Sequence, residues 1–276
     1  MPANTADKRH AFRKLHEAGC FVIPNPWNVG SARYLAGLGF KALATTSAGF
    51  AHAQGLADGA VTLDAMLAHC RELADATDLP VNVDFENGFA HEPEKMADNV
   101  RRCIETGIAG LSIEDFSNDG TEALYDFDSA LARVRAARAI IDKAGGDVIF
   151  TARTEGFLHG RPDLEEAIKR LRTFSDAGAD CLYVPGIKTR EQIAAVVKAV
   201  APKPVNFLNA APLGFTVPDL AALGVRRISV GGTLSRVAMT AFIKAAREIA
   251  SEGRIDSFAG TTPNAELNEF LSELKP

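Results

Sequence analysis

Short apolar runs rich in β-branched residues recur along the chain, and amphipathic stretches lie between them. Eight of these runs predict strands, at residues 21–25, 42–47, 80–86, 110–116, 147–154, 181–186, 204–209 and 227–231. The intervening stretches, for example 164–177 and 191–200, repeat apolar residues at intervals of three and four, which is typical of helices packed on a sheet. Because strands and helices alternate, we expect a closed parallel barrel.

Residues at the ends of the predicted helices support this order of elements. Thr62 is expected to be an N-cap. Asp163 with Glu166, and Thr189 with Gln192, have the spacing of a capping box. Four glycines each end a helical stretch shortly before a strand, and we expect them in the left-handed conformation: Gly39, Gly107, Gly178 and Gly224.

The strands are continuously apolar rather than alternating, which indicates a sheet covered on both faces. An open doubly wound sheet is the alternative, but no GxGxxG motif follows the first strand to support a dinucleotide site. No linker or low-complexity segment divides the chain. We therefore predict an α/β protein of one domain, a (β/α)8 TIM barrel over residues 1–276 with a C-terminal helical extension.

The charge balance limits the classes of partner. The 276 residues carry 30 Lys and Arg against 35 Asp and Glu, a net charge of −5, which argues against nucleic acid or an anionic membrane. The N-terminal stretch lacks the apolar core of a signal peptide, and no apolar run reaches the ~20 residues of a membrane span. The four cysteines lie far apart without a CxxC pair, so we expect free thiols and a cytoplasmic protein.

In such a barrel the active site lies at the C-terminal ends of the strands, so polar residues there are candidates. Asp84 and Glu86 stand two apart on one predicted strand, which places both side chains on the same side, and Glu114 ends the next strand. Three carboxylates repel each other unless a cation lies between them, and oxygen ligands suit Mg²⁺ or Mn²⁺. The alternative for each acid is helix capping or pairing with Arg or Lys.

Arg153 ends the fifth predicted strand, where a charged side chain needs an anionic partner. We expect it to hold a substrate carboxylate through two parallel hydrogen bonds. The alternative is a structural salt bridge to Glu155 or Glu114. A metal ion at one end and an arginine at the other would define a site for a small 2-oxo or 2-hydroxy acid.

Five motifs occur in an order that resembles the isocitrate lyase and phosphoenolpyruvate mutase superfamily: TTSAGFAHAQGLADG, VNVDFENGF, LSIEDF, TARTEGF and CLYVPG. The resemblance extends from about Phe12 to Ser257. It implies a Mg²⁺-dependent (β/α)8 barrel that makes or breaks a C–C or P–C bond next to the carboxylate of a 2-oxo acid. It also implies a homo-oligomer, a dimer or tetramer, in which the last barrel helix is exchanged between subunits.

The resemblance further implies roles for individual residues. Asp84 would be a metal ligand, with Glu86 and Glu114 holding the metal mostly through water. Asp58 aligns with an active-site aspartate near the metal and the substrate, and Arg153 with the substrate-binding arginine. The remaining matches are substrate-binding positions: Thr46 and Ser47, whose backbone amides would bind the carboxylate, and Asn209.

The loop after the LSIEDF strand departs from the family's pattern. Lyases acting on isocitrate or methylisocitrate carry a Lys-Lys/Arg-Cys-Gly-His motif there, and the mutases carry lysine and asparagine. Residues 113–128 contain no cysteine, histidine or lysine, and only Asn118 is reminiscent of the mutases. Because the loop lacks its general acid/base, Asp58 and Glu155 are the candidates for moving the proton.

The functional hypothesis is a lyase in which Mg²⁺ and Arg153 fix a small 2-oxo or 2-hydroxy dicarboxylate and a C–C bond breaks to leave an enolate. P–C bond chemistry is the enzymatic alternative. A Schiff-base aldolase would need an inward lysine, whereas Lys188 is expected to face solvent. A barrel that only binds a small anion at Gly231 and Gly232 is the alternative from another class. We expect four other polar or aromatic residues to be structural: His52, His91, His159 and Trp27.

Overall fold

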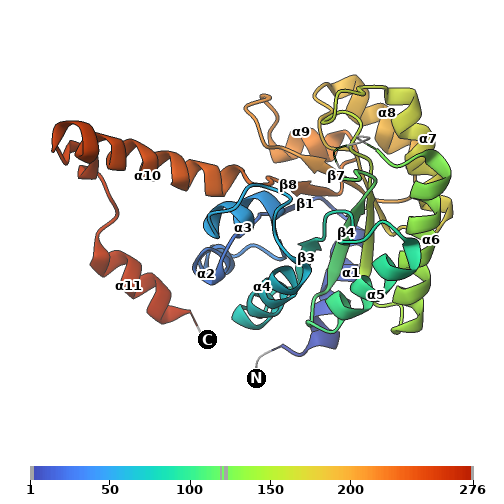
Figure 1. The fold of residues 1–276 in the computed structure, drawn as a ribbon, viewed down its shortest axis with the longest axis horizontal. Coiled ribbons are helices and arrows are strands. Elements are labelled where there is room, and N and C mark those ends of the chain that lie inside the picture. The colour runs from blue at the N-terminus through green and yellow to red at the C-terminus, as the bar shows by residue number, and fades with distance from the viewer. Residues whose placement is uncertain (1–2, 119, 121–123, 275–276) are drawn as a thin grey trace.

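Eight parallel strands pair in the order β1-β8-β7-β6-β5-β4-β3-β2 in the computed structural model, which describes residues 3–118, 120 and 124–274 (Figure 1). Asn25 joins the two ends of this sheet: its amide donates to the Thr45 carbonyl at 2.9 Å and accepts from the Val230 and Gly231 amides. The Ala44 amide also donates to the Pro24 carbonyl at 3.0 Å. The nearly closed sheet with alternating helices confirms the predicted (β/α)8 TIM barrel.

Every predicted strand contains an observed one, and each observed strand is shorter than the range predicted for it. The strands are β1 (Phe21–Ile23), β2 (Leu43–Ala44), β3 (Val81–Asp84), β4 (Gly110–Glu114), β5 (Ile149–Arg153), β6 (Cys181–Tyr183), β7 (Val205–Leu208) and β8 (Arg227–Ser229). The barrel helices are α1 (Thr5–Glu17), α2 (Val29–Gly37), α3 (Ser47–Ala53), α4 (Leu63–Ala76), α5 (Pro93–Ile104), α6 (Phe127–Lys143), α7 (Leu164–Asp176), α8 (Arg190–Val200) and α9 (Val217–Ala222).

Local signals at the helix ends are largely confirmed. The four predicted glycines have φ between +86° and +102°. Thr62 caps α4, and Thr189 with Gln192 forms a complete capping box on α8. The Asp163 carboxylate caps α7 by accepting from two backbone amides, but the Glu166 side chain pairs with Arg170 at 2.9 Å instead of reaching back to the cap.

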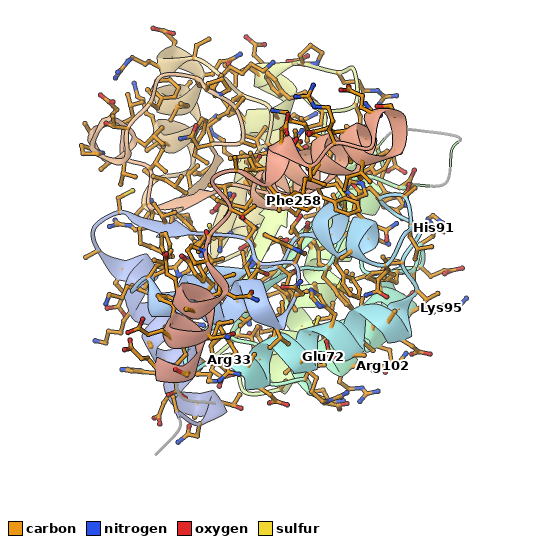
Figure 2. All side chains as sticks on the ribbon, turned by 90° about the vertical axis from the view of Figure 1, so that its left-hand side faces the viewer. Arg33, Glu72, His91, Lys95, Arg102 and Phe258 are labelled. Carbon is orange, nitrogen blue, oxygen red and sulfur yellow. The ribbon has the colours of Figure 1, made fainter. Side chains whose placement is uncertain are left out.

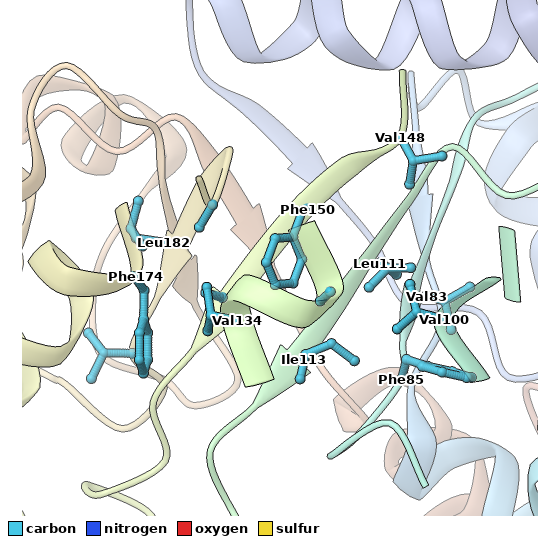
Figure 3. Close-up of a cluster of buried hydrophobic side chains, with 14 of the residues drawn as sticks. Val83, Phe85, Val100, Leu111, Ile113, Val134, Val148, Phe150, Phe174 and Leu182 are labelled. Atoms are coloured by element: carbon cyan, nitrogen blue, oxygen red, sulfur yellow. The ribbon is translucent and has the colours of Figure 1, made fainter. Parts of the chain in front are cut away.

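The main hydrophobic core lies between the strands and the surrounding helices. Figure 3 shows Leu111, Phe150, Val134 and Phe174 in this layer, which the outward side chains of the strands share with α6 and α7. A separate cluster fills one end of the barrel interior, where Phe12 of α1 is fully buried among residues of the strands. Because α1 closes that end, the opposite end, where the strands have their C-termini, is left for a site.

The C-terminal extension comprises α10 (Thr233–Glu252), a short 3₁₀ helix (Asp256–Phe258) and α11 (Asn264–Glu273). Figure 1 shows α10 running away from the barrel and α11 returning toward α2. There Tyr34 contacts the ring of Phe270, with ring centroids 4.4 Å apart, and Arg33, labelled in Figure 2, donates to the Leu274 carbonyl at 3.2 Å. Exchange of a helix between subunits stays a prediction.

Two further expectations concern the whole chain. All four cysteines are free thiols, as predicted, and three of them are buried. Across the described residues, no helix combines the length and apolar character that crossing a lipid bilayer requires.

Candidate functional site

A cavity of about 160 Å³ lies at the C-terminal ends of the strands and continues down into the barrel. Five of the predicted site residues line it: Thr46, Ser47, Asp58, Asp84 and Arg153. Four others do not belong to its lining: Glu86, Glu114, Glu155 and Asn209. The cavity therefore brings together about half of the expected site, and the remaining acids lie around it.

Arg153 is the centre of a buried ion-pair network. Its Nη1 atom lies 3.1 Å from Asp84 Oδ1 and 3.3 Å from Glu114 Oε2, and its Nε atom donates to Glu155. The guanidinium also lies over the ring of Tyr183, 5.1 Å from its centroid. The structural salt bridge that the sequence left open as an alternative is thus present, and binding of a substrate carboxylate by Arg153 stays a prediction.

Asp115 holds the backbone next to this network through hydrogen bonds to the residues that follow Arg153. Its carboxylate accepts from the backbone amide of Glu155 at 2.8 Å, from the Thr154 hydroxyl at 2.7 Å and from Arg170 at 3.0 Å. Burial alone would favour a neutral Glu155, but the charge of Arg153 and the hydrogen bonds from His159 and Arg153 outweigh it and lower the pKa of Glu155. Glu155 is therefore held as an anion inside the protein.

Ser47 and Thr46 are both engaged by protein groups. The Ser47 amide and hydroxyl donate to Asp84 Oδ2 at 3.2 and 3.1 Å. The Thr46 hydroxyl caps α3 by accepting from the Gly49 amide at 3.2 Å. The Ser47 amide, which the family resemblance assigns to a substrate carboxylate, is thus directed at the carboxylate of Asp84 in this structure.

The placement of Glu86 corrects one step of the sequence argument. Strand β3 ends at Asp84, and Glu86 follows in a left-handed conformation with φ +49°, so strand alternation does not set its direction. Burial, and then the charges of Asp84 and Asp58, raise the pKa of Glu86 to about 8. Its Oε1 atom is buried and has no hydrogen-bond partner within the described part of the chain.

These acids also bear on the predicted metal ion. Within residues 3–118, 120 and 124–274, no three His, Cys, Asp or Glu side chains are grouped closely enough to hold a metal ion directly. Binding of a metal ion by Asp84, with Glu86 and Glu114 acting mostly through water, stays a prediction. The donor set nevertheless fits a hydrated divalent cation, because Asp58, Asp84 and Glu86 bring like charges together and leave one carboxyl oxygen unpartnered.

Asp58 lies at the mouth of the cavity, in the segment between α3 and α4. Asp58 is exposed to solvent as a residue, but neighbouring protein atoms partly exclude water from its carboxyl group. This desolvation, followed by the charge of Asp84, raises the pKa of Asp58. A carboxyl group of raised pKa beside a cavity is suited to carrying a proton.

The remaining predictions concern residues around the mouth. Asn118 is exposed, has φ +57° and donates to the Gly59 carbonyl at 3.4 Å, as in a turn; residues 119 and 121–123 of the same loop lie outside the described residues. Lys188 is exposed, as expected. Gly231 has φ +54° and its amide donates to Asn25, which favours a tight turn over an anion cradle.

The three histidines differ in their surroundings. His52 is exposed, and His91 contacts the Tyr125 hydroxyl at 2.8 Å. His159 stacks on Phe116 with ring centroids 3.7 Å apart, and its Nε2 atom lies 3.6 Å from Glu155. None of the three lines the cavity.

The sequence did not single out several polar residues that line the cavity, among them Tyr183, Asn206 and Arg227. Tyr183 is the last residue of β6, Asn206 lies inside β7, and Arg227 is the first residue of β8. Asn206 has apolar neighbours on both sides, and Arg227 and Ser229 flank the apolar Ile228. Polar residues at such positions signal a polar barrel interior, since one side of each strand faces the axis.

Known proteins share both the sequence pattern and this fold. The profile of the phosphoenolpyruvate phosphomutase family matches residues 12–250. Oxaloacetate decarboxylase of Paraburkholderia xenovorans (strain LB400) is 30% identical over 248 residues, which cover 86% of this chain and 80% of that protein.

Two solved structures extend the similarity to the three-dimensional fold. One from Burkholderia cenocepacia J2315, provisionally described as a lyase/mutase, is 43% identical with a TM-score of 0.93, over 97% of each chain. Oxaloacetate acetylhydrolase in complex with its product oxalate is 30% identical with a TM-score of 0.83, over 98% of this chain and 95% of that one. The likeness therefore includes both the barrel and most of the C-terminal extension.

Proposed function

Because the chain belongs to the phosphoenolpyruvate phosphomutase family, within the isocitrate lyase/PEP mutase superfamily, we propose that it is a carbon–carbon lyase for a small 2-oxo or 2-hydroxy dicarboxylic acid. The observation that carries this proposal is the cavity at the strand ends, which Asp58, Asp84 and Arg153 line together. Two similar proteins are described as acting on oxaloacetate, so oxaloacetate is the first substrate to examine.

The bond that breaks is a C–C bond adjacent to a carboxylate-bearing carbon. In a 2-oxo dicarboxylate such as oxaloacetate, the carboxylate leaves as CO2 and the electron pair of the broken bond forms the enolate of the remaining 2-oxo acid. In a 2-hydroxy dicarboxylate, the hydroxyl group loses its proton and becomes the carbonyl of the 2-oxo product, while the electron pair forms the enolate of the other carboxylate fragment. The enolate fragment then takes up a proton. Ser47 and Arg153 keep Asp84 in place at the wall of the cavity. When bound, a divalent cation such as Mg²⁺ or Mn²⁺ would be held by Asp84 and Glu86, with Asp58 near it, and would supply positive charge against the developing enolate.

Asp58 is the better of the two candidates for moving the proton. It lines the cavity and its pKa is raised, so it can hold a proton beside the substrate. Glu155 lies outside the lining, bonds to Arg153 and has a lowered pKa. We assign Glu155 the role of orienting Arg153, since it does not face the cavity.

The test is a product assay on 2-oxo and 2-hydroxy dicarboxylates, oxaloacetate and 2,3-dimethylmalate among them, and on phosphonopyruvate. Pyruvate, oxalate, glyoxylate and phosphate are measured with and without Mg²⁺. Asp58→Asn should lower kcat by at least about 100-fold, the usual contribution of a positioned acid or base. Asp64→Asn, whose carboxylate is exposed at the start of α4, is the matched control and should leave kcat unchanged.

The products of this assay distinguish a C–C lyase, an enzyme that cleaves P–C bonds and a barrel that only binds its ligand. Cleavage of a dicarboxylate that depends on Mg²⁺ and on Asp58 supports the lyase and identifies its substrate class. Phosphate released from phosphonopyruvate alone would replace C–C with P–C chemistry. Binding of these acids without any product would leave a binding barrel and refute the lyase.

A further inference from the structure

The floor of the cavity holds a second arginine, Arg227, which the ion-pair network does not use. It is the first residue of β8, only 3% exposed, and lines the cavity. Its Nε atom donates to Asn206 Oδ1 at 2.8 Å and its Nη2 atom to Thr151 Oγ1 at 2.9 Å, while Nη1 lies 3.3 Å from His16 Nε2. The guanidinium therefore extends through the barrel interior toward α1.

The groups around Arg227 are neutral. Asn206 and Thr151 carry no charge, and the His16 Nδ1 atom lies 2.8 Å from the Phe12 carbonyl, which requires a proton on Nδ1 and leaves Nε2 as an acceptor for Arg227. Burial, and then the charge of Arg227, lower the pKa of His16 to about 3, so this ring stays neutral near pH 7.

Arg153 and Arg227 thus differ although both line one cavity. Arg153 pairs with three carboxylates, whereas none of the three hydrogen-bond partners that the structure gives Arg227 is anionic. A buried cation without a counter-charge is costly, and a small anion beside it would offset that cost.

The neighbouring lining of the lower cavity is polar as well. Asn82, Ser112, Asn206 and Ser229 are buried, face the barrel axis and line the cavity with Arg227. Barrel interiors are usually filled by branched apolar side chains, which could not hydrogen-bond to an anion. At the upper end, in contrast, Asp58 and Asp84 would repel a carboxylate.

We propose that Arg227 and the polar side chains beside it form an anion subsite for a carboxylate group, and that this subsite selects ligands with a second acidic group. The chemistry recognised is a small carboxylate, whether it is one end of the substrate or a separate organic anion. Only the first of these two sources rests on the proposed lyase function.

The experiment measures binding of malonate and of propionate, in which a methyl group replaces one carboxylate, by isothermal titration calorimetry with and without Mg²⁺. With Mg²⁺ bound beside Asp84, one carboxylate of malonate can lie at the upper end while the other reaches Arg227, whereas propionate can make only one of these contacts. We therefore expect the wild-type protein with Mg²⁺ to bind malonate at least about tenfold more tightly than propionate, the difference that one charge-assisted hydrogen bond provides. Arg227→Gln should abolish this difference, and Arg227→Lys, which keeps the charge, should retain most of it. Arg226→Gln, the adjacent arginine that donates to the Gly19 carbonyl, is the matched control and should change neither affinity.

Two results would overturn the subsite. One is equal binding of malonate and propionate by the wild-type protein with Mg²⁺, a result that needs no variant and so does not depend on whether Arg227→Gln folds. The other is an equal loss of both ligands in a folded Arg227→Gln variant, which would make Arg227 a structural residue.

Competition identifies the source of the anion. If the substrate's own carboxylate occupies the subsite, malonate competes with the substrate and Arg227→Gln raises KM more than it lowers kcat. If a separate anion binds there, malonate and substrate bind together. A protein that discriminates malonate from propionate yet cleaves none of the acids would retain the subsite and lose the lyase function.

Discussion

The charged side chains inside the barrel form two levels with different partners. Arg153, near the strand ends, is held by acids from three consecutive segments of the fold, and its position is defined by charge. Arg227, deeper in the barrel, is held by neutral groups, and its charge is available to a ligand. The same residue type therefore has two different functions, because its surroundings differ.

At the residue scale, Asp115→Asn should lower the free energy of unfolding by about 3 kcal/mol. The change leaves the buried Arg170 facing an uncharged amide and weakens the contacts to Thr154 and to the Glu155 backbone. Urea denaturation at pH 7 measures the effect. Asp98→Asn, which breaks an exposed ion pair with Arg101, is the matched control and should cost less than about 1 kcal/mol; equal costs would contradict a structural role for Asp115.

At the scale of elements, α1 acts as the closure of the barrel. Phe12 fills the closed end, and His16 on the next turn meets Arg227. This packing keeps a neutral histidine buried, with a pKa of about 3 against about 6.5 in the unfolded chain. Docking of α1 is therefore linked to pH.

The unfolded chain binds a proton at His16 below pH 6.5 and the folded chain does not. The contribution of His16 to the free energy of unfolding should therefore be constant above pH 6.5. It should lower the free energy of unfolding progressively as the pH drops from 6.5 toward 3. His16→Gln should reduce the loss between pH 6.5 and 5 by about 2 kcal/mol, measured by urea denaturation at each pH. His10→Gln, at an exposed position of the same helix, should leave the slope as in the wild type; an unchanged slope in His16→Gln would refute the link.

Strand β4 packs closely against the closed end of the barrel at Gly110. A methyl group there would lie 2.6 Å from the Phe12 ring, 2.8 Å from Asn82 and 3.0 Å from the Ile149 carbonyl. Gly110→Ala should therefore destabilise the protein by about 1–3 kcal/mol through overpacking. Gly30→Ala, in helix α2 with its nearest contact at 3.6 Å, should be neutral or stabilising in the same thermal unfolding experiment. A neutral Gly110→Ala would show that α1 can move away.

At the scale of the whole molecule, the C-terminal extension is only partly covered by its own chain. Along α10 the side chain of Ser235 is buried, while Val237, Phe242 and Ile243 are exposed. Figure 2 shows Phe258, also exposed, in the segment that leads on to α11. Exposed apolar surface of this kind marks an interface.

We therefore expect the protein to form a dimer or tetramer through α10. Phe242 is 65% exposed, and Phe242→Ser should shift the assembly toward the monomer, as measured by size-exclusion chromatography with light scattering across a dilution series. Leu158→Ser, which alters another exposed apolar residue away from α10, should leave the mass unchanged. A monomeric wild-type protein would refute this assembly.

The order of strands and helices, most of the helix ends that were predicted and the polar strand ends could be read from the sequence. These features depend on periodicity and on residues close along the chain: the φ of Gly39 and the cap at Thr62 are local properties. The superfamily could be predicted as well, because its motifs are short segments with a fixed order.

The tertiary structure alone decided which charges pair and which face the cavity. Arg153 could serve a substrate or a salt bridge until three acids from separate segments were placed around it. Glu86 could be assigned to a strand face until β3 ended at Asp84. Arg227 gave no signal of its role until α1, β5 and β7 surrounded it with neutral partners. Ionic interactions depend on distance and burial between residues far apart in the chain, and only the closed barrel determines both.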